Sequence, residues 1–90
     1  MGALNNTTIT LGGTAQQLLP ERPGRTELII QPVDEDCWVN FGSTNAAVNV
    51  GELVMVNSFS RFHVSDFPEV GGRVSIFSAT TGSHINYRDV

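Results

Sequence analysis

The sequence contains no lysine, and its charged residues are few. Every cationic side chain other than histidine is an arginine, and the nine acidic residues leave a formal net charge of −4. The arginines are Arg22, Arg25, Arg61, Arg73 and Arg88. Because these scattered cations cannot neutralise a stripe of phosphates, we expect no nucleic-acid partner. Arginine without lysine instead favours fixed, forked contacts to carboxylates and carbonyl oxygens, as protein interfaces use.

Cysteine and long apolar runs are scarce as well. Cys37 is the only cysteine, which excludes a disulfide within the chain, and His63 and His84 are too distant in sequence to complete a thiolate metal site. We therefore expect Cys37 to be a small apolar residue in a strand, and we expect no metal or other cofactor. No run reaches the roughly 18 apolar residues of a membrane span, and the first residues lack the pattern of a secretory signal. These absences predict a chain with no membrane partner, made in a cytoplasm-like compartment.

Catalytic motifs are also lacking. The spacings of the nucleophile elbow, the HExxH zinc helix, the CxxC pair and the phosphate-binding loop are all missing. His63 alternates with the apolar Phe62 and Val64, which predicts an exposed or interface histidine, and His84 has the same relation to Ile85. A domain of this size also offers little room to exclude water from reacting groups. We therefore predict that the protein is not an enzyme.

What the sequence does contain is a succession of turn signals. They recur at short intervals, and no stretch keeps the apolar period of a helix for ten residues. We predict an all-β fold, a single-domain β-sandwich or jelly-roll-like barrel of about eight short antiparallel strands, with 1–90 as one domain and 1–6 as a flexible N-terminal arm. Turn signals do not separate a jelly-roll order of strands from an immunoglobulin-like order. The expected strands span 7–11, 16–19, 26–33, 37–41, 47–50, 53–56, 61–64, 74–78 and 84–88.

Two of the expected strands, the third and the sixth, are apolar on both faces. A one-domain sandwich covers only one face of each sheet with its own core, so the second apolar face predicts a neighbouring chain. We predict a subunit interface formed by outward-facing Ile29, Trp38 and Val54, with Arg61 and Arg73 as its polar contacts. The alternative is that loops of the same chain cover Ile29 and Val54.

The acidic loop 34–36 (Asp34, Glu35, Asp36) links two apolar strands. A calcium ion needs six to eight oxygen ligands, and this loop has neither the EF-hand spacing nor a glycine for the turn. The favoured interpretation is a solvated turn whose charges discourage aggregation at the strand edge. Binding of a cation by this loop stays open at this point.

The order of several segments carries a family resemblance. An apolar strand opened by arginine at 25–31 is followed by VNFG at 39–42, by an apolar strand opened by glycine at 51–56, and by VSIFSATTG at 74–82. Over roughly residues 25–88 this order resembles small structural proteins of tailed bacteriophage virions. The acidic loop departs from the resemblance, because a neutral polar turn would be more usual there.

The resemblance implies a non-enzymatic capsid decoration, or cement, protein. Such a protein is a β-sandwich, often a homotrimer, that binds the major capsid protein on the exterior of the virion after synthesis in the host cytoplasm. Its partners are the major capsid protein and further copies of itself. For the capsid-binding arm we expect Thr7, Thr8, Ile9 and Thr10, a β-prone segment suited to pairing with an exposed sheet edge.

Two alternatives stay open. The chain could be a low-copy tail, collar or head-fibre component of the same kind of particle. It could also be a glycan-binding module that recognises the host surface, with Trp38 or Tyr87 as the stacking platform.

Overall fold

The fold is all-β, as predicted. The computed structural model describes residues 5–90, and within them the only helical segment is the short 3-10 turn η1 (Pro68–Gly71). The eight strands are β1 (Asn5–Thr8), β2 (Gln16–Leu19), β3 (Glu27–Pro32), β4 (Cys37–Phe41), β5 (Glu52–Val54), β6 (Ser60–His63), β7 (Val74–Phe77) and β8 (His84–Asp89).

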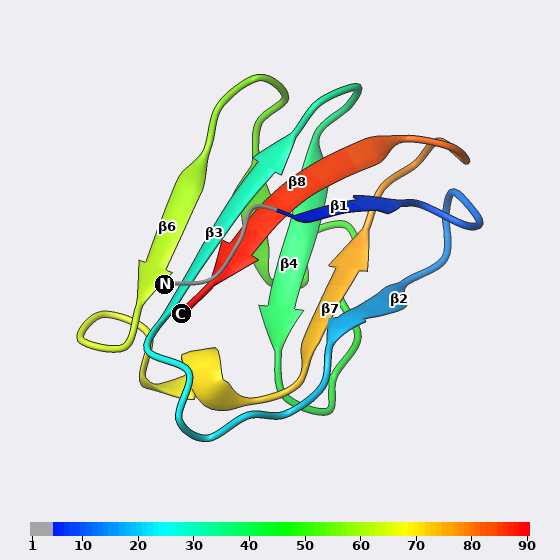
Figure 1. The fold of residues 1–90 in the computed structure, drawn as a ribbon. Helices are drawn as coiled ribbons and strands as arrows, with labels where there is room; N and C mark the ends of the chain where they lie inside the picture. The colour runs from blue at the N-terminus through cyan, green and yellow to red at the C-terminus, as the bar shows by residue number, and fades with distance from the viewer. Residues whose placement is uncertain (1–4) are drawn as a thin grey trace.

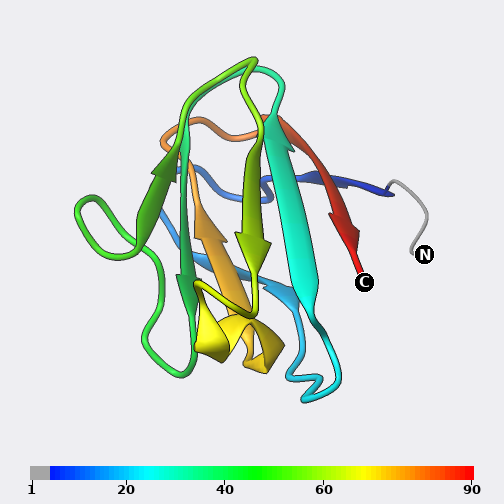
Figure 2. The same ribbon diagram turned by 90° about the vertical axis from the view of Figure 1, so that its left-hand side faces the viewer.

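The strands form two antiparallel four-stranded sheets packed face to face (Figures 1 and 2). One sheet has the order β1-β8-β3-β6 and the other β2-β7-β4-β5. In this order β1 pairs with β8, β2 with β7, β3 with β6 and β4 with β5, as if one long hairpin had been rolled up. This nested pairing is the jelly-roll arrangement, so the structure selects it over the immunoglobulin-like alternative.

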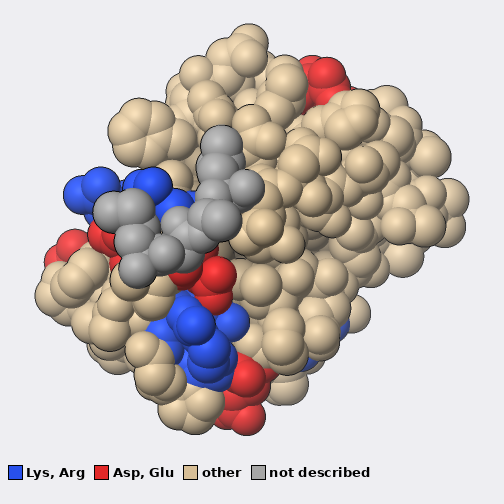
Figure 3. Space-filling model, viewed as in Figure 1, with Lys and Arg blue, Asp and Glu red and all other residues tan. Residues whose placement is uncertain are grey.

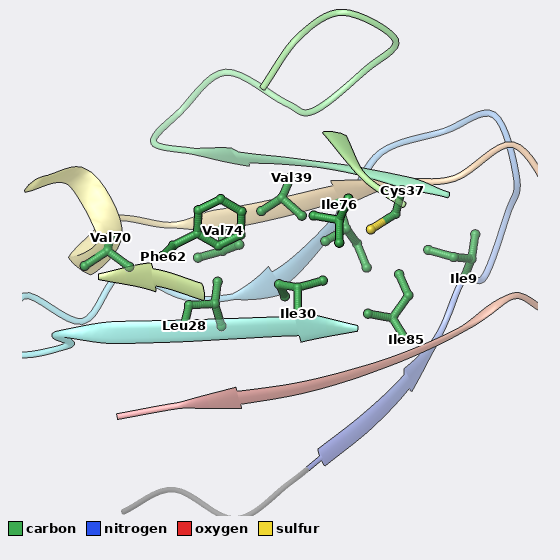
Figure 4. Packing of buried hydrophobic residues seen from close by; sticks show 11 residues of the cluster. Ile9, Leu28, Ile30, Cys37, Val39, Phe62, Val70, Val74, Ile76 and Ile85 are labelled. Atoms are coloured by element: carbon green, nitrogen blue, oxygen red, sulfur yellow. The ribbon is translucent and has the colours of Figure 1, made fainter. Parts of the chain in front are cut away.

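The core lies between the sheets and follows from strand alternation. In β3 every second residue is buried, because successive side chains of a strand point to opposite faces. Figure 4 shows the buried side chains of β3 and β8 meeting those of β4 and β7. The buried cluster consists of Ile9, Leu28, Ile30, Cys37, Val39, Val54, Phe62, Val70, Val74, Ile76 and Ile85.

Two expected strands differ from the structure in the middle of the chain. The predicted strand at 47–50 is a turn that carries only an isolated bridge between Ala47 and Val50. The predicted strand at 53–56 is β5, which begins at Glu52 and ends at Val54. The left-handed backbone of Asn49 (φ 64°) explains the first difference, because such a residue turns the chain out of an extended strand.

The N-terminal arm also differs from its prediction. Asn5 and Asn6, placed in the flexible arm 1–6, belong to β1 and pair with Tyr87 and Asn86 of β8. The rest of that arm, residues 1–4, lies outside the described residues. The backbone of β1 is therefore paired along one of its edges with β8 of the same chain.

Candidate interaction surfaces

The outer face of the β1-β8-β3-β6 sheet carries charge. Ile29 in β3 lies between Arg61 of β6 and Arg88 of β8, its two cross-strand partners. Arg61 Nε also forms an ion pair with Glu27 at 3.1 Å, and the partner of Glu27 across the strands is His63. Figure 3 views the molecule from this side and shows acidic and basic atoms gathered on the part of the surface near the C-terminus. We call Glu27, Ile29, Arg61, His63 and Arg88 the charged face.

The opposite sheet carries an apolar row across three strands. Trp38 in β4 lies directly beside Leu53 in β5 and Phe77 in β7, and such cross-strand partners point to the same side of a sheet. Trp38 occupies the outward phase of β4, as the sequence predicted. Leu53 is 45% exposed, and Met55, two positions further on, is 52% exposed. We call Trp38, Leu53 and Phe77 the apolar face.

The loop between β4 and β5, residues 42–51, covers the other part of this sheet. The backbone N–H of Ala46 donates to the buried Ser75 Oγ at 2.9 Å, and Asn40 Nδ2 donates to the carbonyl of Thr44 at 2.9 Å. The loop rises on the outer side of β4 (Figure 4) and exposes Val48. The chain therefore covers one end of the sheet itself, whereas at the other end Leu53 is exposed and Trp38 and Phe77 are partly buried.

The predicted subunit interface is corrected at Val54. Val54 is only 1% exposed and belongs to the core, so it cannot contact another subunit. The prediction took the wrong phase of β5, because a short run that is apolar on both faces does not indicate which residue points inward. Leu53, its neighbour, is the residue that faces outward.

The remaining predicted interface residues lie on different surfaces. Ile29 and Arg61 belong to the charged face, whereas Trp38 belongs to the apolar face on the far side of the sandwich. Arg73 precedes β7 and donates from Nε to Gln17 Oε1 at 2.9 Å. One flat contact cannot include both Ile29 and Trp38.

The predicted capsid-binding residues are not free. Thr7 and Thr8 pair with Ile85 and His84 of β8, so their strand is already part of a sheet. Ile9 is buried in the core, and the Thr10 N–H donates to a glutamine carbonyl oxygen, Gln16 Oε1, at 2.8 Å. β1 is nevertheless an edge strand of its sheet. Any strand addition at this place would therefore use the second edge of β1 and not a detached arm.

Arg25 has a role that the sequence analysis missed. Its guanidinium is buried and donates to Asp89 Oδ2 at 3.1 Å and to the carbonyls of Val70, Gly72 and Pro20 at 3.0, 3.0 and 2.9 Å. These are the forked contacts that arginine favours, but they lie within the chain and not at an interface. Nothing local in the sequence distinguishes Arg25 from the exposed arginines, because apart from Pro20 its partners come from two distant segments, 70–72 and the end of β8.

The acidic loop uses two of its carboxylates for hydrogen bonds within the chain. Asp34 Oδ2 accepts from the backbone N–H of His84 at 2.7 Å and lies 2.8 Å from His84 Nδ1. The backbone N–H of His84, followed by its side chain, lowers the pKa of Asp34 below the ordinary value of 3.8. Asp36 Oδ1 accepts from the Val56 N–H at 2.7 Å. The loop thus fastens β3–β4 to β8 and to the loop after β5.

Cys37 and the histidines have ordinary structural surroundings. Burial, and then the nearby Asp36 carboxylate, raise the pKa of the Cys37 thiol to about 12, so the thiol is protonated at neutral pH. His63 is exposed, as expected, and its Nδ1 accepts from the Ser65 N–H at 3.1 Å in a local turn. Tyr87, one of the two proposed stacking platforms, packs partly buried against the core.

The part of the chain from residue 5 to residue 90 contains no pocket and no cluster of three or more histidine, cysteine, aspartate or glutamate side chains suited to a metal ion. It also has no helix of the length and apolarity needed to cross a bilayer. No protein-family model, curated protein or solved structure matches the sequence or the fold. The observations that bear on function are therefore the surfaces described above.

Proposed function

We propose that this chain is a non-enzymatic structural protein of a virion, a capsid decoration protein that binds the major capsid protein and associates with further copies of itself. The observation that carries the proposal is an apolar row on a small jelly roll, in which the partly buried Trp38 lies between Phe77 and the exposed Leu53. Contiguous exposed apolar side chains on a soluble domain mark protein contacts. The resemblance over residues 25–88 supplies the context of a viral particle and of a homotrimer.

The proposed mechanism is burial repeated many times. A single contact made by a 90-residue domain is small, but a shell presents the same site in many symmetric copies. Once one subunit of an oligomer is bound, the effective concentration of its partners at the next site is high. Many individually weak contacts would therefore together hold neighbouring capsid subunits in place and resist expansion of the shell.

Contact with the shell is proposed at the outer edge of β1. β1 is an edge strand, and an edge strand offers backbone groups to an added strand of a partner. Hydrogen exchange of the protein with and without purified shells tests this contact. Slower exchange confined to β1 and its surroundings is expected on binding, and unchanged exchange of β1 in the bound protein would refute the edge contact.

Copy number per particle tests the function itself. Quantitative mass spectrometry of purified particles, with the major capsid protein as internal standard, is expected to find this chain in hundreds of copies, as symmetric decoration requires. About a dozen copies or fewer would place the chain in the tail, collar or a head fibre instead. Absence from the particle would refute a virion role.

A glycan-binding function is a second candidate, and Trp38 is the observation that favours it. Its indole lies on an outer face beside Phe77 and Leu53, and aromatic faces of this kind stack on sugars. A glycan array that is silent, together with host adsorption unaffected by Trp38→Ala, would remove this candidate. Binding that is lost in Trp38→Ala and kept in Phe59→Ala, a change at another exposed aromatic, would support it.

A further inference from the structure

Ser75 is buried although its side chain points away from the core. In β7 its neighbours Val74 and Ile76 belong to the core cluster, so Ser75 takes the outward phase of the strand. Its exposed fraction is nevertheless 0%. The β4–β5 loop lies over it, and the N–H of Ala46 in this loop donates to Ser75 Oγ at 2.9 Å. The loop is therefore the cover of this part of the outer surface.

Few contacts attach this loop to the sheet. Ala46 is its only buried residue, and none of its residues is charged, so it forms no ion pair. Two hydrogen bonds join residues 43–50 to the rest of residues 5–90. One is the bond to Ser75, and the other runs from Asn40 Nδ2 to the carbonyl of Thr44. A segment with one small buried side chain and two such bonds opens at a fraction of the free energy that unfolds the whole domain.

The loop begins and ends at glycines with positive φ. Gly42 has φ 97° and Gly51 has φ 105°. Hinges of moving loops are a few terminal residues, often small, that absorb backbone rotation. A Cβ at Gly42 would meet nothing within 4 Å, whereas Gly51 lies tightly against Val39. The N–H of Gly42 is bonded to the carbonyl of Arg73 at 2.7 Å, so rotation on the C-terminal side of Gly42 lifts the loop while Gly51 keeps its other end in place.

We propose that the β4–β5 loop is a movable cover, which opens while both sheets stay folded. Opening separates Ala46 from Ser75 and exposes the Ser75 hydroxyl together with the side chain of Asn40, its cross-strand partner. Along β4 and β7 these two residues follow Trp38 and Phe77 on the same side of the sheet. Opening therefore enlarges the outer surface beside the apolar face by two neutral polar groups, with water replacing the Ala46 N–H at Ser75 Oγ.

Native-state hydrogen exchange of the full wild-type chain tests the opening. After correction for intrinsic rates, the Ala46 amide is expected to exchange at least about 100-fold faster than the slowest amides of β4 and β7. Its rate is also expected to depend little on urea, because opening of the loop exposes little surface. If Ala46 exchanges as slowly as those amides and with the same urea dependence, the loop opens only when the whole domain unfolds, and the proposal is wrong.

Two buried serines provide matched variants. Ser75→Ala removes the acceptor of the Ala46 N–H and is expected to speed exchange of Ala46 roughly three- to tenfold. Ser78→Ala is the control, because the bond from Ser78 Oγ to the carbonyl of Asp36 stays in place when the loop opens. It is expected to speed exchange of the slowest amides and to leave Ala46 unchanged. Equal acceleration of Ala46 by the two variants would overturn the proposal.

Thiol labelling measures the exposure of position 75 directly. Ser75→Cys places a thiol under the loop, and the native Cys37, buried in the core from β4, is the control in the same chain. With each rate divided by that of the urea-unfolded chain, the thiol at position 75 is expected to react at least about 100-fold faster than Cys37. Equal rates would refute a separate opening. No virus particle enters these measurements, so their failure and the failure of the proposed function are distinguishable.

Discussion

Arg25 shows how one charged side chain can hold three distant segments together. It is 2% exposed, and its guanidinium joins the loop before β3 to η1 and to the end of β8. Asp89 also receives Arg22 Nη2 at 3.1 Å, so the carboxylate serves two arginines. A buried charge is tolerated only when its donors are satisfied, and here each nitrogen of the guanidinium has an acceptor.

Arg25→Ala is therefore expected to destabilise the fold by about 3 kcal/mol, because the carbonyls of Pro20, Val70 and Gly72 would lose their donor. Thermal unfolding measures the change, and a decrease in Tm of about 12–24 °C corresponds to it for a domain of this size. Arg73→Ala is the control, since Arg73 makes one exposed hydrogen bond to Gln17 and its loss is expected to cost below about 1 kcal/mol. Equal losses from the two variants would contradict the role assigned to Arg25.

Because of Asp34, the stability of the fold is expected to depend on pH. Its pKa is lowered in the folded state from 3.8, chiefly by the backbone N–H of His84, so the ionised carboxylate favours folding above pH 3.8. As pH falls through the lower pKa of the folded state, the carboxylate is protonated and this contribution is lost. The wild-type protein is therefore expected to melt above Asp34→Asn at pH 5–7, and the gap in Tm is expected to close as the pH falls below 3.8.

The control for Asp34 is Glu35→Gln in the same loop. Nothing in residues 5–90 provides Glu35 with a hydrogen bond or ion pair, so this change is expected to leave the pH profile of Tm as in the wild type. A constant gap between the wild type and Asp34→Asn down to pH 2 would disprove the assignment of the carboxylate.

Among the elements, β5 is the shortest strand and depends on a glycine. Gly51 precedes it with φ 105°, a left-handed conformation that side chains rarely adopt. A Cβ at this position would also collide with the carbonyl oxygen of Val39 in β4. The close approach lets β5 pair with β4, which in turn places Leu53 beside Trp38 on the apolar face.

Gly51→Ala is accordingly expected to cost about 2 kcal/mol or more and to disturb the pairing of β4 with β5. Chemical denaturation measures the cost, and amide exchange shows whether β5 opens first. Gly24→Ala is the matched control, because a Cβ at Gly24 meets nothing within 4 Å, and a change within about 0.5 kcal/mol is expected. If the two substitutions are equally mild, the tight approach of Gly51 to Val39 is not essential.

The edge strands explain where the chain is open to partners. β1 and β6 end one sheet, and β2 and β5 end the other. The exposed apolar residues Leu53, Met55 and Phe59 lie in β5 and in the loop that follows it. Apolar contact is therefore expected around β5, whereas the polar β1 is suited to backbone pairing.

The molecule as a whole is closed by contacts between its two ends. Asn5 pairs with Tyr87, and Thr8 pairs with His84, so the first and last strands are neighbours in one sheet. Each inner pair of the jelly roll encloses less of the chain than the pair outside it. Most paired strands are thus distant in sequence. Bringing them together costs the conformational entropy of the long segments between them, and this cost comes before the contacts that offset it.

Folding in milliseconds to seconds is the expected result of this topology. Trp38 is the only tryptophan and lies partly buried in β4, so its fluorescence reports on folding in a stopped-flow experiment. Complete folding within the dead time of the instrument, well below a millisecond, would show that local contacts dominate and would contradict the expectation.

The particular residues show how much of the fold and surface the sequence could predict. Recurring turns and short apolar alternations indicated all-β structure, a small number of strands and outward Trp38 and His63, because these depend on spacing along the chain. The phase of β5 could not be predicted, since Leu53 and Val54 are both apolar and only the partner strand decides which one is buried.

Local patterns along the chain thus determined the class of fold, and the single cysteine by itself excluded a disulfide within the chain. Tertiary structure alone decided the jelly-roll order, the pairing of β1 with β8, the burial of Arg25 and the placement of Trp38 between Leu53 and Phe77. The physical reason is range. Propensity, alternation and turns act between near neighbours, whereas sheet order and burial depend on residues up to the full length of the chain apart.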